Sequence, residues 1–148
     1  MARDRRLAAV SGAQLVMGVL GTAVAVRRRR QYDFLALHGR PEHVARDAVL
    51  MGTALSAPVT MLTAQAVATV VLWRGPSRRA RVAVTGLGVT MISGYLGEQL
   101  VRQRLTRSGY DAVETPIVVT GLTLAVAMAV LGGHGAGAGR SSASRVRS

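Results

Sequence analysis

The sequence predicts an all-α fold: an integral membrane bundle of four transmembrane helices with antiparallel neighbours and short loops. The first observation is that the apolar residues gather in runs without any charge, at Leu7–Val26, Ala48–Trp73, Val82–Gly97 and Ile117–Gly139. The second is that all 19 basic residues are arginines outside these runs, where cations meet lipid headgroups. Since roughly 20 helical residues cross a bilayer, we expect helices at about 7–26, 46–73, 82–101 and 115–133.

The first expected helix follows a basic N-terminus, residues 1–6. The start of the chain resembles a secretory signal, because RDRR precedes an apolar stretch that ends in Ala23-Val24-Ala25. The apolar part is long for a signal, however, and Arg27 to Arg30 follow at once, which disfavours export after cleavage. We therefore expect an uncleaved membrane anchor.

The second expected helix begins near Pro41, since proline suits a first helical turn. It contains Pro58, which removes one backbone hydrogen bond, so we expect a kink there. Gln14 in the first helix and Gln65 in the second fall on the same side of the bilayer midplane. They are expected to hydrogen bond across the helices, and a polar path is the alternative interpretation.

A short basic turn, residues 74–81, joins the second and third helices, and small residues spaced four apart occur on every helix. In the third helix these are Gly86, Thr90 and Gly94, which we expect to pack against a neighbour. Asp111 and Glu114 resemble a capping box for the fourth helix. The domain organisation is thus the basic N-terminus, a transmembrane domain over 7–133, and a tail over 134–148 that we expect to be disordered and basic.

Glu98 lies at the end of the third helix, and two interpretations remain open. It reaches the membrane interface and pairs with Arg102 one turn on, or it turns inward and titrates or binds a cation. His43 and Asp47 enter from the same side and are candidates to join Glu98 in a polar or proton site. The alternative is an interface helix with local pairs. No HxxxH or ExxH spacing supports a metal site, so we expect no metal and no cofactor.

The orientation is not set by charge, because ten arginines lie on the side of the N-terminus and nine on the other. The acids do segregate, with only Asp4 on the N-terminal side. We expect a bacterial plasma (inner) membrane location with both termini in the cytoplasm, and dual topology remains an alternative.

Composition narrows the function classes. With one Phe, one Trp and three Tyr, the chain lacks the aromatic residues on which bases stack, so we expect no nucleic-acid partner. There is no cysteine and no Ser/His/Asp set, so we expect no enzyme. We expect a small multi-pass membrane protein that acts through a membrane protein partner or as a homo-oligomer, with anionic lipid headgroups at its arginine clusters. The alternative is a small proton-coupled or cation transporter that uses Glu98.

Overall fold

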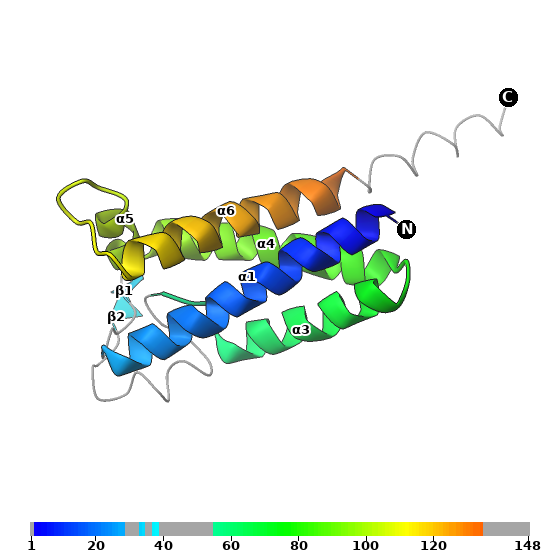
Figure 1. The fold of residues 1–148 in the computed structure, drawn as a ribbon, viewed down its shortest axis with the longest axis horizontal. Coiled ribbons are helices and arrows are strands. Elements are labelled where there is room, and N and C mark those ends of the chain that lie inside the picture. The colour runs from blue at the N-terminus through cyan, green and yellow to red at the C-terminus, as the bar shows by residue number, and fades with distance from the viewer. Residues whose placement is uncertain (1, 29–32, 35–36, 39–54, 135–148) are drawn as a thin grey trace, which may run out of the picture.

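The computed structural model describes residues 2–28, 33–34, 37–38 and 55–134. Its long helices are α1 (Ala2–Arg27), α3 (Val59–Arg74), α4 (Arg78–Gly97) and α6 (Glu114–Gly133) (Figure 1). A short helix, α5 (Gln99–Arg104), follows α4. Two-residue strands, β1 (Asp33–Phe34) and β2 (Leu37–His38), pair antiparallel with Asp33 opposite His38. The predicted fold class, all-α, is confirmed.

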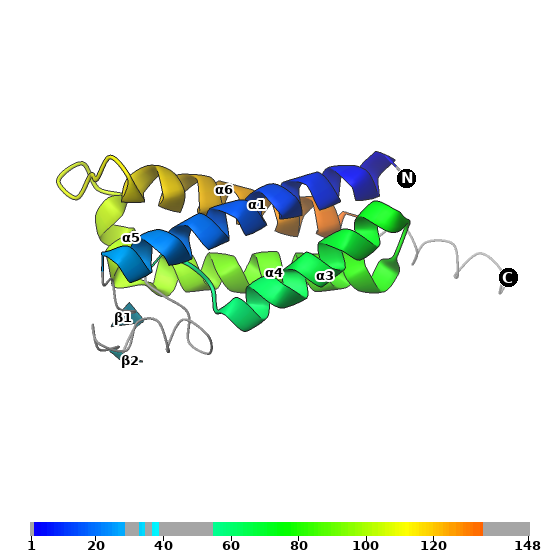
Figure 2. The same cartoon turned by 60° about the horizontal axis from the view of Figure 1, so that its bottom comes forward.

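The long helices form an up-and-down bundle. Helix α1 packs against α3 and α6, and α4 packs against the same two helices, so α1 and α4 lie diagonally across the bundle (Figures 1 and 2). The start of α1, the α3–α4 turn and the end of α6 gather at one end, which we call the N-terminal end. Helix α5 and the β-hairpin lie at the opposite end, the α5 end (Figure 2).

Buried positions recur at alternating spacings of three and four residues, as in helices that cross at a shallow angle. On α1 the buried side is polar or small at most of these positions: Asp4, Leu7, Ala8, Ser11, Gln14, Gly18, Gly21 and Ala25. On α6 it comprises Glu114, Ile117, Val118, Gly121, Ala125, Met128 and Gly132. The interior is therefore built from close backbones and polar groups as much as from large apolar side chains.

Among the described helices, α1 and α6 are long and apolar enough to cross a membrane, and α3 is a shorter apolar helix. Only 28% of the apolar window of α1 and 33% of that of α6 is buried inside the bundle. These two helices are weak evidence for membrane association by themselves, because a signal sequence or a core helix has the same length and composition.

The basic N-terminus is part of the first helix. The sequence suggested a separate segment over residues 1–6, whereas α1 already begins at Ala2. Asp4 lies in its first turn, where the helix dipole favours a negative charge. Its carboxylate also accepts two hydrogen bonds from Arg81 of α4, at 3.1 and 2.8 Å. The ion pair between Asp4 and Arg81 thus stabilises the start of α1, which contains three arginines.

The expected kink at Pro58 is wrong. Pro58 precedes α3 with an extended backbone, φ −52° and ψ 145°, and its carbonyl accepts the hydrogen bond of Leu62. Proline has no N–H to continue a helix and disfavours helical geometry at the residue before it. The expected helix over 46–73 is therefore interrupted at residues 55–58, and its part over 46–54 lies outside the described residues.

The expected third helix, 82–101, is also interrupted. Helix α4 starts earlier, at Arg78. Ser77 caps this start, because its side-chain oxygen accepts a hydrogen bond from the Ala80 N–H at 3.3 Å. It ends at Gly97, because Glu98 is extended (φ −76°, ψ 126°), and α5 begins at Gln99. Glu98 is thus the junction of two helices.

Gly86 and Gly94 do not pack against a neighbour within the described residues, contrary to the prediction. A Cβ at either position would meet no atom within 4 Å in the described part of the chain. The close approach occurs at Gly88, where a Cβ would lie 2.9 Å from the Ala125 carbonyl oxygen and 3.0 Å from the Ala129 nitrogen. Helix α4 therefore turns a different small-residue face to α6 than the spacing of four suggested.

Candidate functional site

Glu98 is buried at the α5 end of the bundle, with 6% of its surface exposed. Its N–H still donates to Gly94 in α4, and its carbonyl accepts from Arg102 in α5, at 3.1 and 3.2 Å. The residue thus links both helices through its backbone while its side chain is held within the protein. A buried carboxyl at a helix interruption is a position where membrane proteins bind ions or protons.

The expected side-chain pair between Glu98 and Arg102 does not form. Arg102 is exposed, and its Nη1 donates to the Leu96 carbonyl at 3.5 Å. The extended residue at 98 changes the phase between α4 and α5, so that Val101 rather than Arg102 is buried. The other two members of the candidate site, His43 and Asp47, lie outside the described residues.

Gln14 and Gln65 meet in the bundle interior. Gln65 Nε2 donates to Gln14 Oε1 and to the Ser11 carbonyl, both at 2.9 Å. Thr69 Oγ1 donates to the Gln65 carbonyl at 2.7 Å, so Ser11 Oγ is the donor in its 2.7 Å contact with Thr69. A polar network thus joins α1 and α3.

The Gln65 amide also sets the orientation of this network. Exchanging its oxygen and nitrogen would bring two acceptors together at the Ser11 carbonyl, so the Nε2 group faces α1. Gln65 Oε1 is then buried without a hydrogen-bond partner among the described residues. Interhelical amide contacts of this kind stabilise membrane bundles by about 0.6 kcal/mol on average, up to about 1.7 kcal/mol.

A second charged cluster surrounds Glu114, at the start of α6, and the sequence interpretation missed it. Glu114 is fully buried, and its Oε1 accepts from Arg28 at 2.9 Å while its Oε2 accepts from Arg104 at 2.8 Å. Arg28 also contacts Asp111 at 3.0 Å. The cluster ties the end of α1 to α5 and to the start of α6.

Asp111 caps α6, although not in the expected reciprocal form. Its Oδ1 accepts from the N–H groups of Val113 and Glu114 at 2.9 and 2.8 Å. The Asp111 N–H donates to Thr115 Oγ1, not to Glu114, whose carboxylate is taken by the two arginines. Hydrogen bonds from the Glu114 and Val113 backbone, assisted by Arg28, lower the pKa of Asp111 from 3.8 to about 2. Side-chain hydrogen bonds to Glu114 and, to a smaller extent, to Asp111 raise the pKa of Arg28.

A signal for the missed cluster is present in the sequence. The buried positions Ser11, Gly18 and Ala25 of α1 are seven apart, as are Gln14 and Gly21, and continuing the second series reaches Arg28. Glu114, Gly121 and Met128 repeat in the same way on α6. A period of seven in small and polar residues, instead of in leucines, marks the inward faces.

Within the described residues, no group of three or more His, Cys, Asp and Glu side chains is placed to hold a metal ion. No known protein family, curated protein or solved structure matches the chain.

Proposed function

We propose that the chain is a multi-pass membrane protein that spans the bilayer four times and acts by associating with another copy or with a membrane protein partner. The observation that supports the proposal is the number of large apolar side chains on the outside of the bundle. They face outward on all four long helices, although the interior already combines large apolar side chains with polar and small ones. Examples of the outward set are Val16, Val19, Leu20, Val67, Val70, Trp73, Val82, Val89, Leu96, Val119, Val126 and Val130, each at least 43% exposed.

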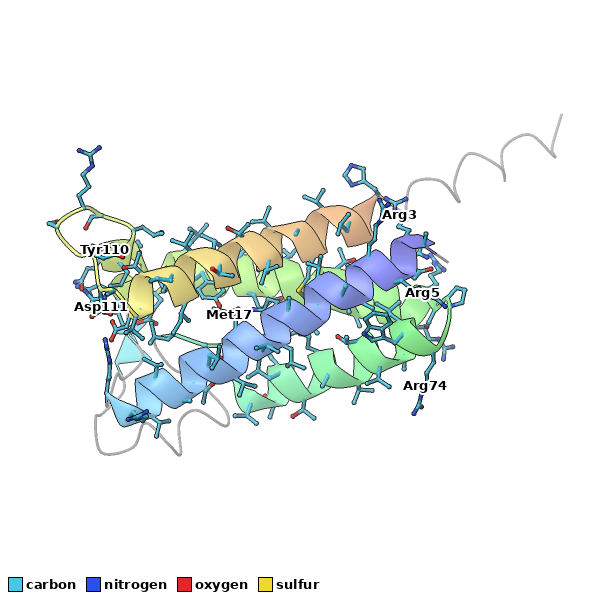
Figure 3. All side chains as sticks on the ribbon, in the orientation of Figure 1. Arg3, Arg5, Met17, Arg74, Tyr110 and Asp111 are labelled. Atoms are coloured by element: carbon cyan, nitrogen blue, oxygen red, sulfur yellow. The ribbon has the colours of Figure 1, made fainter. Side chains whose placement is uncertain are left out.

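Water does not favour such a surface, since soluble proteins rarely expose contiguous apolar patches larger than a few hundred Å². The charge distribution agrees with a bilayer. Figure 3 shows Arg3, Arg5 and Arg74 at one end of the bundle and Asp111 at the other, with Met17 between them. Twenty-residue helices such as α4 and α6 are about 30 Å long, which matches a hydrocarbon core.

The short apolar segments are compatible with this proposal. Helix α3 has 16 residues, or about 24 Å, and the uncharged part of α4 begins only after Arg81. Arginine side chains near helix ends extend their guanidinium groups to the headgroups, and bilayers thin locally around short spans. Both effects accommodate a span somewhat below the usual length.

Topology reporters test the membrane arrangement. Full-length protein should stay in the membrane pellet after alkaline carbonate extraction. Reporters at the N-terminus and at Gly75, in the α3–α4 turn, should give one compartment. A reporter at Tyr110, which lies at the other end of the bundle (Figure 3), should give the opposite one. A chain released by carbonate, or an N-terminus and Gly75 on opposite sides, would refute four spans. Mixed signals at every site would indicate dual topology.

The outer face of α4 supports association. Gly86, Thr90 and Gly94 lie on it, and added Cβ atoms at the two glycines would meet no atom of the described residues within 4 Å. Such a face lets a second helix approach closely in lipid. Energy transfer between donor- and acceptor-labelled copies in liposomes should fall when Gly86→Leu and Gly94→Leu are combined. The matched control Ala23→Leu, on the exposed side of α1, should leave it unchanged. Equal transfer in both variants would place the contact elsewhere.

A second candidate function is proton-coupled or cation transport through Glu98, and the burial of its carboxyl at the α4–α5 junction favours it. Proteoliposomes with a pH gradient should then accumulate the lipophilic cation tetraphenylphosphonium. Glu98→Gln should abolish this uptake, while Arg102→Gln should preserve it, because Arg102 is exposed and does not contact the Glu98 carboxylate. Equal, small effects of both substitutions would exclude transport and leave association.

A further inference from the structure

The two ends of the bundle differ in the availability of their arginines. Within residues 2–28 and 55–134, the N-terminal end carries seven arginines and one acid, and the α5 end carries five arginines and three acids. At the N-terminal end Arg81 alone is paired, with Asp4. The other six guanidinium groups, which we call the arginine collar, are exposed and make no hydrogen bond or ion pair in the described part of the chain: Arg3, Arg5, Arg6, Arg74, Arg78 and Arg79.

At the α5 end the acids reduce the free positive charge. Arg28 and Arg104 both bind Glu114, and Arg28 also binds Asp111. Within residues 2–28 and 55–134, the positive charge that remains for an external partner is therefore concentrated at the N-terminal end. The difference follows from the segregation of the acids along the sequence and from their pairing with Arg28 and Arg104.

The arginine collar borders the outward apolar surface directly. Trp73, the only tryptophan of the chain, precedes Arg74 and is 53% exposed, and Val82, 59% exposed, follows the arginines that begin α4. Tryptophan and arginine together at the edge of an apolar belt are typical of the headgroup level of a bilayer. Figure 3 shows Arg3 and Arg5 of α1 and Arg74 of α3 at this end.

We propose that the arginine collar binds the phosphate groups of anionic phospholipids, so that the protein enriches such lipids around its N-terminal end. This inference rests on the membrane location proposed above. Guanidinium groups match phosphate oxygens with paired hydrogen bonds, and each arginine near an anionic membrane surface strengthens the attraction about fivefold. The Asp4–Arg81 pair holds the start of α1 beside α4, which keeps the arginines of both helices in one region.

Trp73 is a local reporter for the test. The full chain is reconstituted in liposomes that contain brominated phosphatidylglycerol or brominated phosphatidylcholine at the same fraction, and the quenching of its fluorescence is compared. Quenching by the anionic lipid should exceed that by the zwitterionic lipid by at least about twofold at low salt, since several arginines contribute. The preference should shrink at about 1 M salt, where screening acts within about 3 Å.

The collar variant combines Arg74→Gln, Arg78→Gln and Arg79→Gln. Its matched control removes three exposed arginines of the α5 end, by Arg27→Gln, Arg102→Gln and Arg107→Gln. The collar variant, which keeps Arg3, Arg5 and Arg6, should show a clearly smaller preference for the anionic lipid, and the control should keep the full preference. Equal quenching in the unmodified protein, or the same loss in both variants, would overturn the collar. Failure of the protein to enter liposomes at all would overturn the membrane proposal as well.

Discussion

Gly88 offers the sharpest test of how α4 packs on α6, because a matched glycine lies two residues away. A Cβ at Gly88 would lie 2.9 Å from the Ala125 carbonyl oxygen and 3.0 Å from Met128 Cβ. These atoms belong to the backbone, or are fixed directly to it, so they move only if the two helices separate. A Cβ at Gly86 would meet no described atom within 4 Å.

The magnitude follows from the difference between two variants, Gly88→Ala and Gly86→Ala. Replacing glycine by alanine inside a helix favours the helix by about 0.5–1 kcal/mol, and this term is common to both. Overpacking at a close contact costs about 1–3 kcal/mol, and it applies to Gly88 alone. We therefore expect Gly86→Ala to be neutral or stabilising and Gly88→Ala to be about 1–3 kcal/mol less stable than Gly86→Ala.

The free energy of unfolding is measured by titrating detergent-solubilised protein with dodecyl sulfate and following loss of structure by circular dichroism. A high ratio of detergent to protein keeps the chain monomeric, so that association through the outer face of α4 does not contribute. The reasoning is refuted if the two variants are equally stable, or if Gly86→Ala is the less stable one. In either case α4 would be rotated about its axis relative to the structure described above.

Three further predictions concern the polar interior and are tested in the same assay. Glu114→Gln should destabilise the bundle by about 3 kcal/mol. This value is toward the lower end of the range for breaking a buried ion pair, because Arg28 is partly exposed. A loss below about 1 kcal/mol would contradict a buried ion pair at Glu114. The pKa of Asp111 is lowered to about 2. Its contribution to the free energy of unfolding should therefore be constant above about pH 4, the ordinary aspartate range, and disappear as the pH falls through about 2. A titration of the Asp111 carboxyl carbon near about pH 4 by NMR would disprove the cap. Gln65→Leu should cost between about 0.6 and 1.7 kcal/mol. Adding Gln14→Leu should cost little more, since the two side chains share one network, and additive losses would show that they act separately.

The sequence predicted the all-α class because the charge-free runs are long and the arginines mark their ends. It also placed Gln14 and Gln65 at similar depth, since depth depends only on distance along each helix. It did not predict which face of α4 meets α6. Alternate small residues on that helix, Gly86 and Gly88, differ in phase by about half a turn, and both fit a small-residue pattern. The choice depends on the positions of Ala125 and Ala129 on another helix.

Glu114 illustrates a second limit, which concerns charge rather than phase. At the start of a helix, an acid has a sufficient local explanation in the helix dipole and in capping. The structure assigns the capping to Asp111 and Thr115 and leaves the Glu114 carboxylate for Arg28 and Arg104. These partners lie on α1 and α5, so no local pattern distinguishes a capping glutamate from a buried one. Only the period of seven on α1, whose continuation reaches Arg28, connects the two.

Glu98 shows how one backbone angle decides between two chemical roles. In a continuous helix Glu98 and Arg102 would lie one turn apart on the same face, and a local ion pair would follow. With ψ at 126°, residue 98 leaves the helix and α5 restarts in a new phase, so Val101 turns inward and Arg102 turns to solvent. The packing of α5 on α6 and the contact between Arg104 and Glu114 hold α5 in this phase. The same buried pair that fixes the start of α6 therefore also fixes the burial of Glu98, so Glu114→Gln should release α5 and expose the Glu98 carboxyl.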